Sequence, residues 1–338
     1  MLKLITGSGV RCVFAFIWLM ALVACDTNRS SLPVSSPTVV KAEEPSLQAE
    51  MAATAIPTPV QTPTGTATAT PSQGPAPTNK PKSPLTYTRL ITLASNLAEP
   101  DDLAVAPDGS LYISDVSAGT IQQYTYSDQL TVIVAGLSEP EGMVILADGT
   151  LVIAEQGWNR LVHFDPRTKK LSPLLNLRSR AGVLGVDGIE LDTISGAEQS
   201  VIIPDSANGT VLRASLDGKQ VTVIARGFAR PTSAWAEADG SILVTDENAN
   251  ALKRIRPNGV VEKLASLPVP DDVIEDVAGN IYVATIGDNA IHMIAAATQR
   301  DTVLVSGLSS PQGIVFDADG NLVVADPGHH RLLKVVLN

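Results

Sequence analysis

The sequence predicts an all-β fold: a six-bladed β-propeller of four-stranded antiparallel blades, preceded by a lipoprotein signal peptide and a disordered linker rich in proline and threonine. A unit of about 40 residues recurs six times after residue 84, a period typical of propellers. Each unit contains a turn between two short apolar runs, and the segment between residues 26 and 84 holds 11 of the 23 prolines. We therefore divide the chain into residues 1–24, 25–84 and 85–338.

Composition limits the classes of function. The formal net charge is −11 and no basic cluster is present, so we do not expect nucleic acid to bind, because its phosphates attract Lys and Arg. The two cysteines, Cys12 and Cys25, both lie in the first 25 residues. The predicted propeller can therefore form no disulfide, which for an exported chain suggests a bacterial envelope.

The N-terminal residues predict export and a lipid anchor. Lys3 and Arg11 are basic, and the apolar run over 12–24 is shorter than the roughly 20 residues that span a bilayer, as in a signal peptide. The run ends in Leu-Val-Ala-Cys at 22–25, which resembles the bacterial lipobox. We expect Cys25 to carry acyl chains and to hold the chain on the extracytoplasmic side of a cell membrane. An ordinary secretory signal in which Cys25 is incidental is the alternative.

The segment 26–84 is predicted to be a disordered spacer. Its prolines alternate with Thr, Ala and Ser, and no apolar periodicity is present. Such a segment cannot bury enough apolar surface to offset the entropy of ordering the chain. We expect it to lift the folded part away from the membrane.

Each repeat begins with a landmark, a proline followed by polar or small residues and then an apolar stretch. The six landmarks start at Pro100, Pro140, Val186, Pro231, Pro270 and Pro311. Next come turns at Asp108-Gly109, Asp148-Gly149, Ser195-Gly196, Asp239-Gly240, Ala278-Gly279 and Asp319-Gly320. Asp-Gly between apolar runs predicts a hairpin, because glycine adopts positive φ without steric cost. The third repeat is the least regular, since it lacks the proline and has extra residues at 178–184 and 192–199.

Each repeat is long enough for four strands, and the last repeat stops after its third strand at Asn338. We expect residues 87–93 to supply the missing fourth strand. This pairing would close the ring and leave no open sheet edge.

The last repeat carries a recognisable pattern. Residues 310–326, followed by His330-Arg331-Leu332, resemble the NHL repeat, and Asn159-Arg160-Leu161 repeats its end. The resemblance covers essentially all of residues 85–338 and implies a propeller. NHL propellers are similar to the gluconolactonase/regucalcin and strictosidine-synthase-like groups, and more distantly to virginiamycin B lyase. A shared fold does not establish a shared function.

A metal site is predicted at one mouth of the axial channel. The residues after the landmarks start the innermost strands and should converge there; they are Asp101, Glu141, Asp187, Thr232, Asp271 and Gln312. Four of the six are carboxylates, which repel one another and suit a hard divalent cation such as calcium. We therefore expect Asp101, Glu141, Asp187 and Asp271 to be metal ligands. The alternative is that these acids are solvated or bond nearby amides.

The gluconolactonase/regucalcin resemblance bears on this site. That group places an Asp or Asn metal ligand before a Gly at the start of an inner strand, a pattern that Asp187-Gly188 matches and Glu141-Gly142 approaches. Its Asn ligands have no clear counterpart, although Gln312 lies where one could stand. Neighbouring strand residues point to opposite faces, so we expect only one residue each of Asp101/Asp102 and Asp271/Asp272 to face the axis.

The surrounding loops offer a candidate ligand face. Trp158, Gln312 and His329 are its predicted members, Trp158 because tryptophan is enriched in binding hot spots. His329 and His330 are adjacent and should point apart, so we assign no catalytic pair. No catalytic triad can be assembled from the spacing.

Two functions remain open. The first is a monomeric binding module, anchored to the membrane, that binds an envelope protein, a glycan or a small ligand. The second is a divalent-metal-dependent hydrolase of lactonase type, with Glu141, Asp187 and either Asp101 or Asp271 as ligands. A lyase related to virginiamycin B lyase is a weaker variant of the second.

Overall fold

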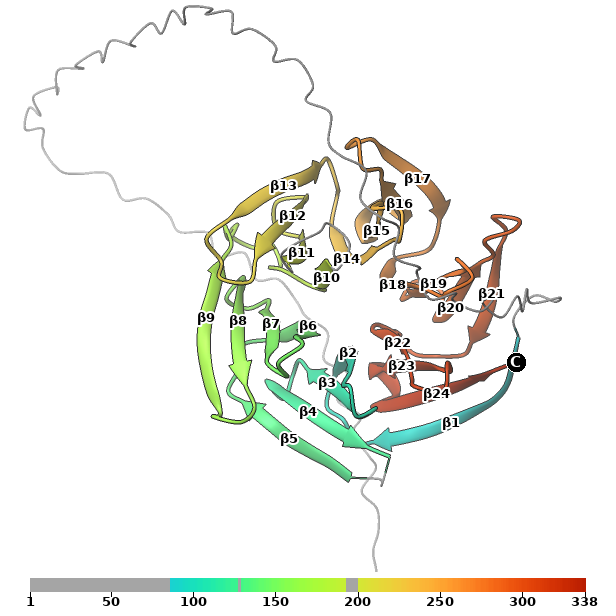
Figure 1. Ribbon diagram of the computed structural model, residues 1–338. Helices are drawn as coiled ribbons and strands as arrows, with labels where there is room; N and C mark the ends of the chain where they lie inside the picture. The colour runs from blue at the N-terminus through green and yellow to red at the C-terminus, as the bar shows by residue number, and fades with distance from the viewer. Residues whose placement is uncertain (1–85, 127–128, 193–199) are drawn as a thin grey trace, which may run out of the picture. The chain divides into compact units, whose positions relative to one another are not determined.

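The computed structural model describes residues 86–126, 129–192 and 200–338. They form six four-stranded antiparallel sheets arranged around one axis, which confirms the six-bladed propeller (Figure 1). Helical structure in these ranges is limited to two short 3-10 turns, Glu247–Ala249 and Pro327–His329. None of the described helical segments is long and apolar enough to cross a membrane. The predicted signal peptide, Cys25 and the linker lie outside the described residues.

Within each blade, the strand named first lies next to the axis, and the other three follow it outwards in the order given. Blades 1 to 3 contain β2 (Pro100–Val105), β3 (Leu111–Asp115), β4 (Thr120–Thr125) and β5 (Gln129–Ala135); β6 (Pro140–Ile145), β7 (Leu151–Glu155), β8 (Arg160–Asp165) and β9 (Lys170–Asn176); and β10 (Glu190–Asp192), β11 (Ser200–Asp205), β12 (Thr210–Ser215) and β13 (Val221–Arg226). Blades 4 and 5 contain β14 (Pro231–Ala236), β15 (Ile242–Asp246), β16 (Ala251–Ile255) and β17 (Val261–Ser266); and β18 (Pro270–Glu275), β19 (Ile281–Thr285), β20 (Ala290–Ile294) and β21 (Asp301–Ser306). Blade 6 contains β22 (Ile314–Phe316), β23 (Leu322–Asp326), β24 (Arg331–Leu337) and β1 (Tyr87–Ser95).

Blade 6 is completed by the start of the described chain, as predicted. β1 pairs antiparallel with β24, from Tyr87 opposite Leu337 to Ser95 opposite Arg331. In Figure 1 the two strands lie side by side at the rim of the ring. The first and last strands therefore close the propeller, as the truncated sixth repeat requires.

The turns between the first and second strands follow the Asp-Gly prediction. In the five described turns, the glycine has a φ between 79° and 84°; these are Gly109, Gly149, Gly240, Gly279 and Gly320. The predicted turn at Ser195-Gly196 lies outside the described residues. These turns mark one end of each blade, so the residues that start the inner strands gather at the other end.

A β-bulge follows the proline landmark of four blades. In blade 1 the pairing of β2 with β3 shifts between Pro100 and Leu103, and blades 2, 4 and 5 shift at the same place. The strict alternation expected from sequence is therefore interrupted. As a result Asp101 and Asp102 both line the axial cavity, and so do Asp271 and Asp272. The expectation that only one of each pair faces the axis was wrong.

At least one hydrogen bond joins each pair of neighbouring blades next to the axis. The donors and acceptors, in order from the junction of blades 1 and 2, are Met143 N to Asp102 Oδ2 (2.7 Å), Gly142 N to Asp187 O (3.2 Å), Gly188 N to Thr232 O (2.7 Å), Thr232 Oγ1 to Asp271 O (2.8 Å), Ile314 N to Asp272 Oδ2 (2.7 Å) and Gly313 N to Asp101 O (2.9 Å). We call these six contacts the axial ring. A Cβ on Gly142 would lie 2.5 Å from the Ile189 nitrogen, so this close approach requires glycine.

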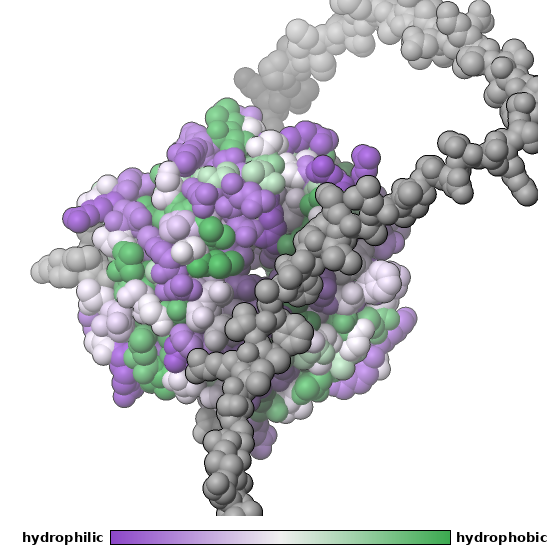
Figure 2. All heavy atoms as spheres, turned by 180° about the vertical axis from the view of Figure 1, so that it is seen from behind, coloured by the Kyte–Doolittle hydropathy of each residue, from purple (hydrophilic) through white to green (hydrophobic). Residues whose placement is uncertain are grey.

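Apolar side chains fill the spaces between the blades further out. For example, Val152 and Ala154 of blade 2 pack against Val201 and Ile203 of blade 3 in one fully buried cluster. On the side of the propeller seen in Figure 2, polar side chains separate small apolar groups wherever the surface is not covered by grey atoms. The core is therefore a set of blade-to-blade contacts, with no disulfide among the described residues.

A carboxylate at the end of the second strand ties down the loop that leads into the first strand. Asp115 accepts hydrogen bonds from the Ala98 and Glu99 amides at 2.9 Å, and Asp246 accepts from the Ala229 and Arg230 amides. Glu155 and Asp326 do the same in blades 2 and 6. This recurring contact fixes the start of the inner strands and thus the residues at the mouth.

We predict that a chain shortened to begin at Leu97 will be less stable than one that begins at residue 85. The shorter chain lacks β1, which leaves β24 as an open edge and exposes apolar contacts of blade 6. The melting temperature should fall by about 10 °C or more, since roughly 2–4 °C corresponds to 1 kcal/mol for a domain of this size. Circular dichroism measures this, and equal melting temperatures would contradict the role of β1 in closing the ring.

Candidate functional site

Three of the four predicted metal ligands lie together at the mouth. Asp101 and Glu141 are the second residues of β2 and β6, and Asp187 lies three residues before β10 of blade 3. One carboxylate oxygen from each lies within 4.8 Å of the others. Their relative exposures are 5%, 7% and 6%. The axial ring brings these residues together because each is bonded directly, or through its neighbour, to the next blade. We call this group the acidic mouth.

Asp271, the fourth predicted ligand, lies nearby but outside this group of three. It starts the inner strand of blade 5 and is 7% exposed. Burial raises the pKa of its carboxyl well above the usual range, and the charges of Asp187 and Asp101 raise it further. Asp271 therefore belongs to the same electrostatic site and faces the three carboxylates from across the channel.

Burial and mutual repulsion perturb every carboxyl of the acidic mouth. Burial raises the pKa of Asp101 well above its ordinary value, and the neighbouring charges of Glu141 and Asp187 add to this. Burial, followed by the charge of Asp187, likewise raises the pKa of Glu141. A cation bound among these oxygens would remove the repulsion. Three converging carboxylates are the hard oxygen donors that calcium prefers, so the donor set fits such an ion.

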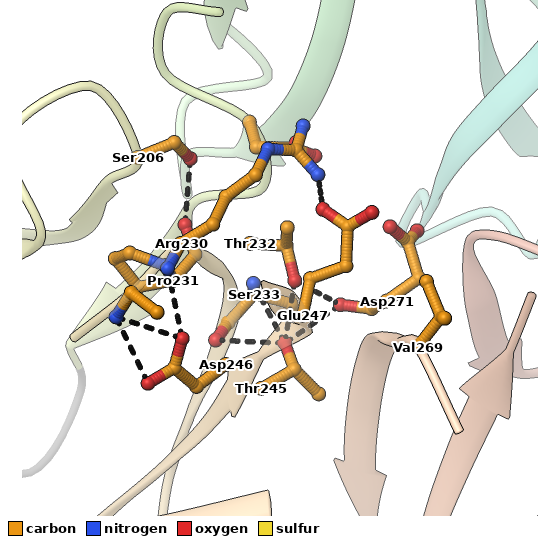
Figure 3. Close-up of polar contacts among 12 residues, drawn as sticks. Ser206, Arg230, Pro231, Thr232, Ser233, Thr245, Asp246, Glu247, Val269 and Asp271 are labelled. Carbon is orange, nitrogen blue, oxygen red and sulfur yellow. Dashed lines mark hydrogen bonds and ion pairs between the residues drawn. The ribbon is translucent and has the colours of Figure 1, made fainter. Parts of the chain in front are cut away.

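Arg230 provides a positive charge at the mouth. Its Nη2 lies 2.6 Å from Asp187 Oδ2, and its other terminal nitrogen pairs with Glu247 (Figure 3). The backbone amide of Arg230 donates to Asp246 at 2.8 Å, which fixes where the side chain begins. Burial raises the pKa of Asp187 and the guanidinium partly opposes this, so the net direction is upward. Arg230 thus orients Asp187 without neutralising the whole group.

Blade 4 contributes a structural residue at the equivalent position. Thr232 is 1% exposed, and its Oγ1 donates to the Asp271 carbonyl oxygen at 2.8 Å. Thr245 Oγ1 donates to the same carbonyl at 2.7 Å (Figure 3). Thr232 therefore joins blades 4 and 5 and holds the start of β18, where Asp271 lies.

The cavity at the axis continues inward from the mouth and has a volume of about 210 Å³. A second layer of carboxyls, Asp102, Glu190 and Asp272, lines it. Asp102 and Asp272 each accept a backbone amide of the next blade, whereas burial, followed by the charges of Asp272 and Asp102, raises the pKa of Glu190 to about 8. The far end is mainly apolar, with Val105, Ile145, Leu191, Trp235 and Val315.

The predicted ligand-face residues are placed differently from one another. Trp158 is 64% exposed in the turn between β7 and β8. Gln312 is half-buried and is not among the residues lining the axial cavity. Its backbone N–H donates to the Ala325 carbonyl oxygen. His329 Nδ1 lies 2.9 Å from Asp326 Oδ2, and His330 Nδ1 lies 2.9 Å from the Ala98 carbonyl. The two histidines thus contact different partners.

Four residues of the site escaped the sequence analysis as members: Asp102, Glu190, Arg230 and Asp272. The bulge after each proline hid the two aspartates, because strict alternation directs one residue of each pair away from the axis. Arg230 precedes a proline landmark and Glu190 follows Asp187 by three positions. These positions relative to the landmarks were the only signals in the sequence for the two residues. Neither position reveals which blade the side chain faces.

Comparison with known proteins identifies the repeat and the fold. Residues 308–335 match the NHL repeat. The fold matches a calcium-binding regucalcin from Agrobacterium tumefaciens with 16% identity and a TM-score of 0.62, over 74% of this chain and 94% of that one. A gluconolactonase from Xanthomonas campestris matches with 15% identity and a TM-score of 0.62, over 76% of this chain and 96% of that one. Virginiamycin B lyase from Staphylococcus aureus matches with 14% identity and a TM-score of 0.57, over 75% of this chain and 100% of that one. No curated protein matches, and such identities show the fold alone.

We predict that Glu190→Gln raises stability at high pH only. Because the folded chain holds the Glu190 proton more tightly than the unfolded chain, its stabilising effect is complete below about pH 4.5 and is lost as the pH rises towards 8. The neutral amide avoids the cost of a buried charge, so the melting temperature at pH 9 without metal should rise by about 5 °C. Thermal unfolding at pH 5 and pH 9 measures this. A change of equal size at both pH values would show that charge is not the cause.

Proposed function

We propose that this chain is a membrane-anchored, extracytoplasmic binding module whose axial mouth holds a divalent cation, with calcium as the first candidate, and uses it to bind a small ligand. The observation that carries the proposal is the acidic mouth. Asp101, Glu141 and Asp187 bring three carboxylate oxygens within 4.8 Å of one another in a buried setting. Their shifted pKa values mark an electrostatic cost that a bound cation would relieve.

The balance of charge at the mouth supports a cation. Arg230 forms ion pairs with Asp187 and Glu247, whereas Asp101, Glu141 and Asp271 form no direct ion pair among the described residues. The more distant charge of Arg230 lowers the pKa of Glu141 and Asp271 only in part. In such a site the carboxyls either keep protons or bind a cation, because several adjacent negative charges cannot persist in a buried setting. The calcium-binding regucalcin shares the fold at 16% identity, which is compatible with the second outcome.

The membrane anchor in this proposal rests on the sequence of the first 25 residues. The lipobox-like residues 22–25 end an apolar run, and a proline-rich segment separates Cys25 from the propeller. Two acyl chains suffice for stable membrane attachment. The partner could be an envelope protein, a glycan or a small molecule, and the acidic mouth favours a small molecule. A monomer is expected.

We expect calcium to raise the melting temperature of the chelator-treated chain in a saturable way. A ligand that binds only the folded state stabilises it by about 2.7 kcal/mol at one hundred times its dissociation constant, or roughly 5–10 °C here. Asp187→Asn and Glu141→Gln should each abolish most of the shift. Asp319→Asn is the control, because its side chain is 80% exposed in the turn at the other end of blade 6.

Absence of a shift with calcium, manganese and zinc would reject the cation site. A shift that survives both Asp187→Asn and Glu141→Gln would place the binding elsewhere. Each variant is compared with itself before and after metal addition. A change in its basal stability therefore does not alter the metal-dependent shift in melting temperature.

A metal-dependent hydrolase of lactonase type is the second candidate function, and Asp271 favours it. Its carboxyl is buried beside the three candidate ligands and its pKa is raised, as expected of a base that works near neutral pH. A divalent cation at the mouth would polarise a carbonyl oxygen. Asp271 would then accept the proton of a water molecule that attacks the carbonyl carbon. A lyase reaction has no comparable observation in its favour.

We predict that, if the chain is a hydrolase, Asp271→Asn lowers lactone turnover by about 100-fold or more while the calcium-dependent shift persists, because a general base contributes roughly that factor. The measurement is pH-stat titration of released acid from five- and six-membered lactones with calcium present. Turnover by the unaltered chain that equals the buffer rate would reject the hydrolase and leave the binding module.

A further inference from the structure

We infer that the loops beside the acidic mouth form a docking platform for the apolar part of the ligand, and that the ligand is a small amphiphile with a neutral head group that carries oxygen atoms. The platform consists of Trp158, Val183 and Leu184. This inference rests on the proposed cation site, because it assigns the chemical class of the ligand that reaches the same mouth.

The three side chains of the platform are unusually exposed for their type. Trp158 is 64% exposed, Leu184 is 55% exposed and Val183 is 44% exposed. Burial of apolar area is favourable by about 25 cal/mol per Å², so a ligand that covers these side chains gains affinity. Tryptophan is also the residue most enriched in binding hot spots.

The two loops that carry the platform are locked against each other. The Val186 amide donates to Asn159 Oδ1 at 2.7 Å, and a Cβ on Gly185 would lie 2.3 Å from the Gln156 carbonyl oxygen. Asn159 is 3% exposed and has a φ of +46°, as expected at a tight turn. The platform is therefore held in place before any ligand arrives, which lowers the entropic cost of binding.

The same two loops deliver two residues of the acidic mouth. Val183 and Leu184 lie just before Val186-Asp187 in the chain, so their loop leads directly into the mouth. The backbone N–H of Gln156 donates to the backbone carbonyl oxygen of Glu139 at 2.9 Å, and Glu139 lies two residues before Glu141. A ligand bound at the mouth would therefore lie next to the platform.

The charges at the mouth favour a neutral head group over an anionic one. A divalent cation would leave the three carboxylates with a net charge of −1, and Arg230 is already shared between Asp187 and Glu247. Asp271 adds a further acidic group on the other side of the channel. Like charges placed together disfavour binding, so hydroxyl or carbonyl oxygens suit this mouth better than a carboxylate or phosphate.

The test compares hexyl β-glucoside with methyl β-glucoside by isothermal titration calorimetry in calcium. It uses the full chain with Cys25→Ser, so that no acyl chain competes for the platform. We expect the hexyl compound to bind at least about tenfold more tightly, because its added methylenes cover the platform. In the Trp158→Ala variant, the affinities of the two compounds should differ by less than about threefold. Val303→Ala is the matched control, because Val303 is 53% exposed on the outer strand β21, and it should keep the full difference.

The calcium-dependent melting shift of each variant separates the two proposals. Equal binding of the two glucosides, absence of binding, or a difference that survives Trp158→Ala overturns the platform, even where the calcium shift is intact. Tighter binding of the hexyl compound that depends on Trp158, in a chain that gives no calcium shift, supports the platform and overturns the cation site.

Discussion

The axial ring is the contact on which the rest of this propeller depends. Six blades can surround an axis only if their inner strands approach closely, and here each junction has a hydrogen bond of the axial ring, with a length between 2.7 and 3.2 Å. The ring therefore dictates glycine where backbones meet, as at Gly142, Gly188 and Gly313, because a Cβ there would lie within 2.9 Å of a neighbouring backbone atom.

The same contact explains why so many carboxyls are buried together. The bulge after the proline frees two residues from pairing within the blade, and both then face the channel. In blades 1 and 5 the second of these, Asp102 or Asp272, accepts an amide of the next blade and so serves the ring. The first, Asp101 or Asp271, is left at the mouth with a raised pKa. Closing the ring and building an acidic site are thus one structural solution.

The sequence predicted the architecture well because repetition multiplies a weak local signal. Six landmarks, six turns and a sixth repeat that lacks its last strand were enough to place β1 beside β24. The clustering of Asp101, Glu141 and Asp187 also followed from their shared position in the repeat. Asp102 and Asp272 could not be assigned because the bulge breaks the alternation on which strand prediction relies.

Contacts between blades were beyond the sequence for a different reason. Arg230 reaches Asp187 across 43 positions, and the pKa of Glu190 depends on Asp272 and Asp102 in other blades. Such partners are set by the rotation between blades, which no local pattern encodes. The third repeat compounds this difficulty, because it lacks the proline landmark and its turn at Ser195-Gly196 lies outside the described residues.

The closing strand has a mechanical consequence. β1 is the outermost strand of blade 6 and pairs with β24 alone, so a pull on the chain at residue 86 is borne first by this one ladder, beginning at Tyr87 and Leu337. Load reaches the bonds around the axis only after it has strained that rim. A force large enough to strip β1 away would bare the edge of β24 while blades 1 to 5 kept their own strands. The weakest point under tension is therefore set by where the chain enters the ring.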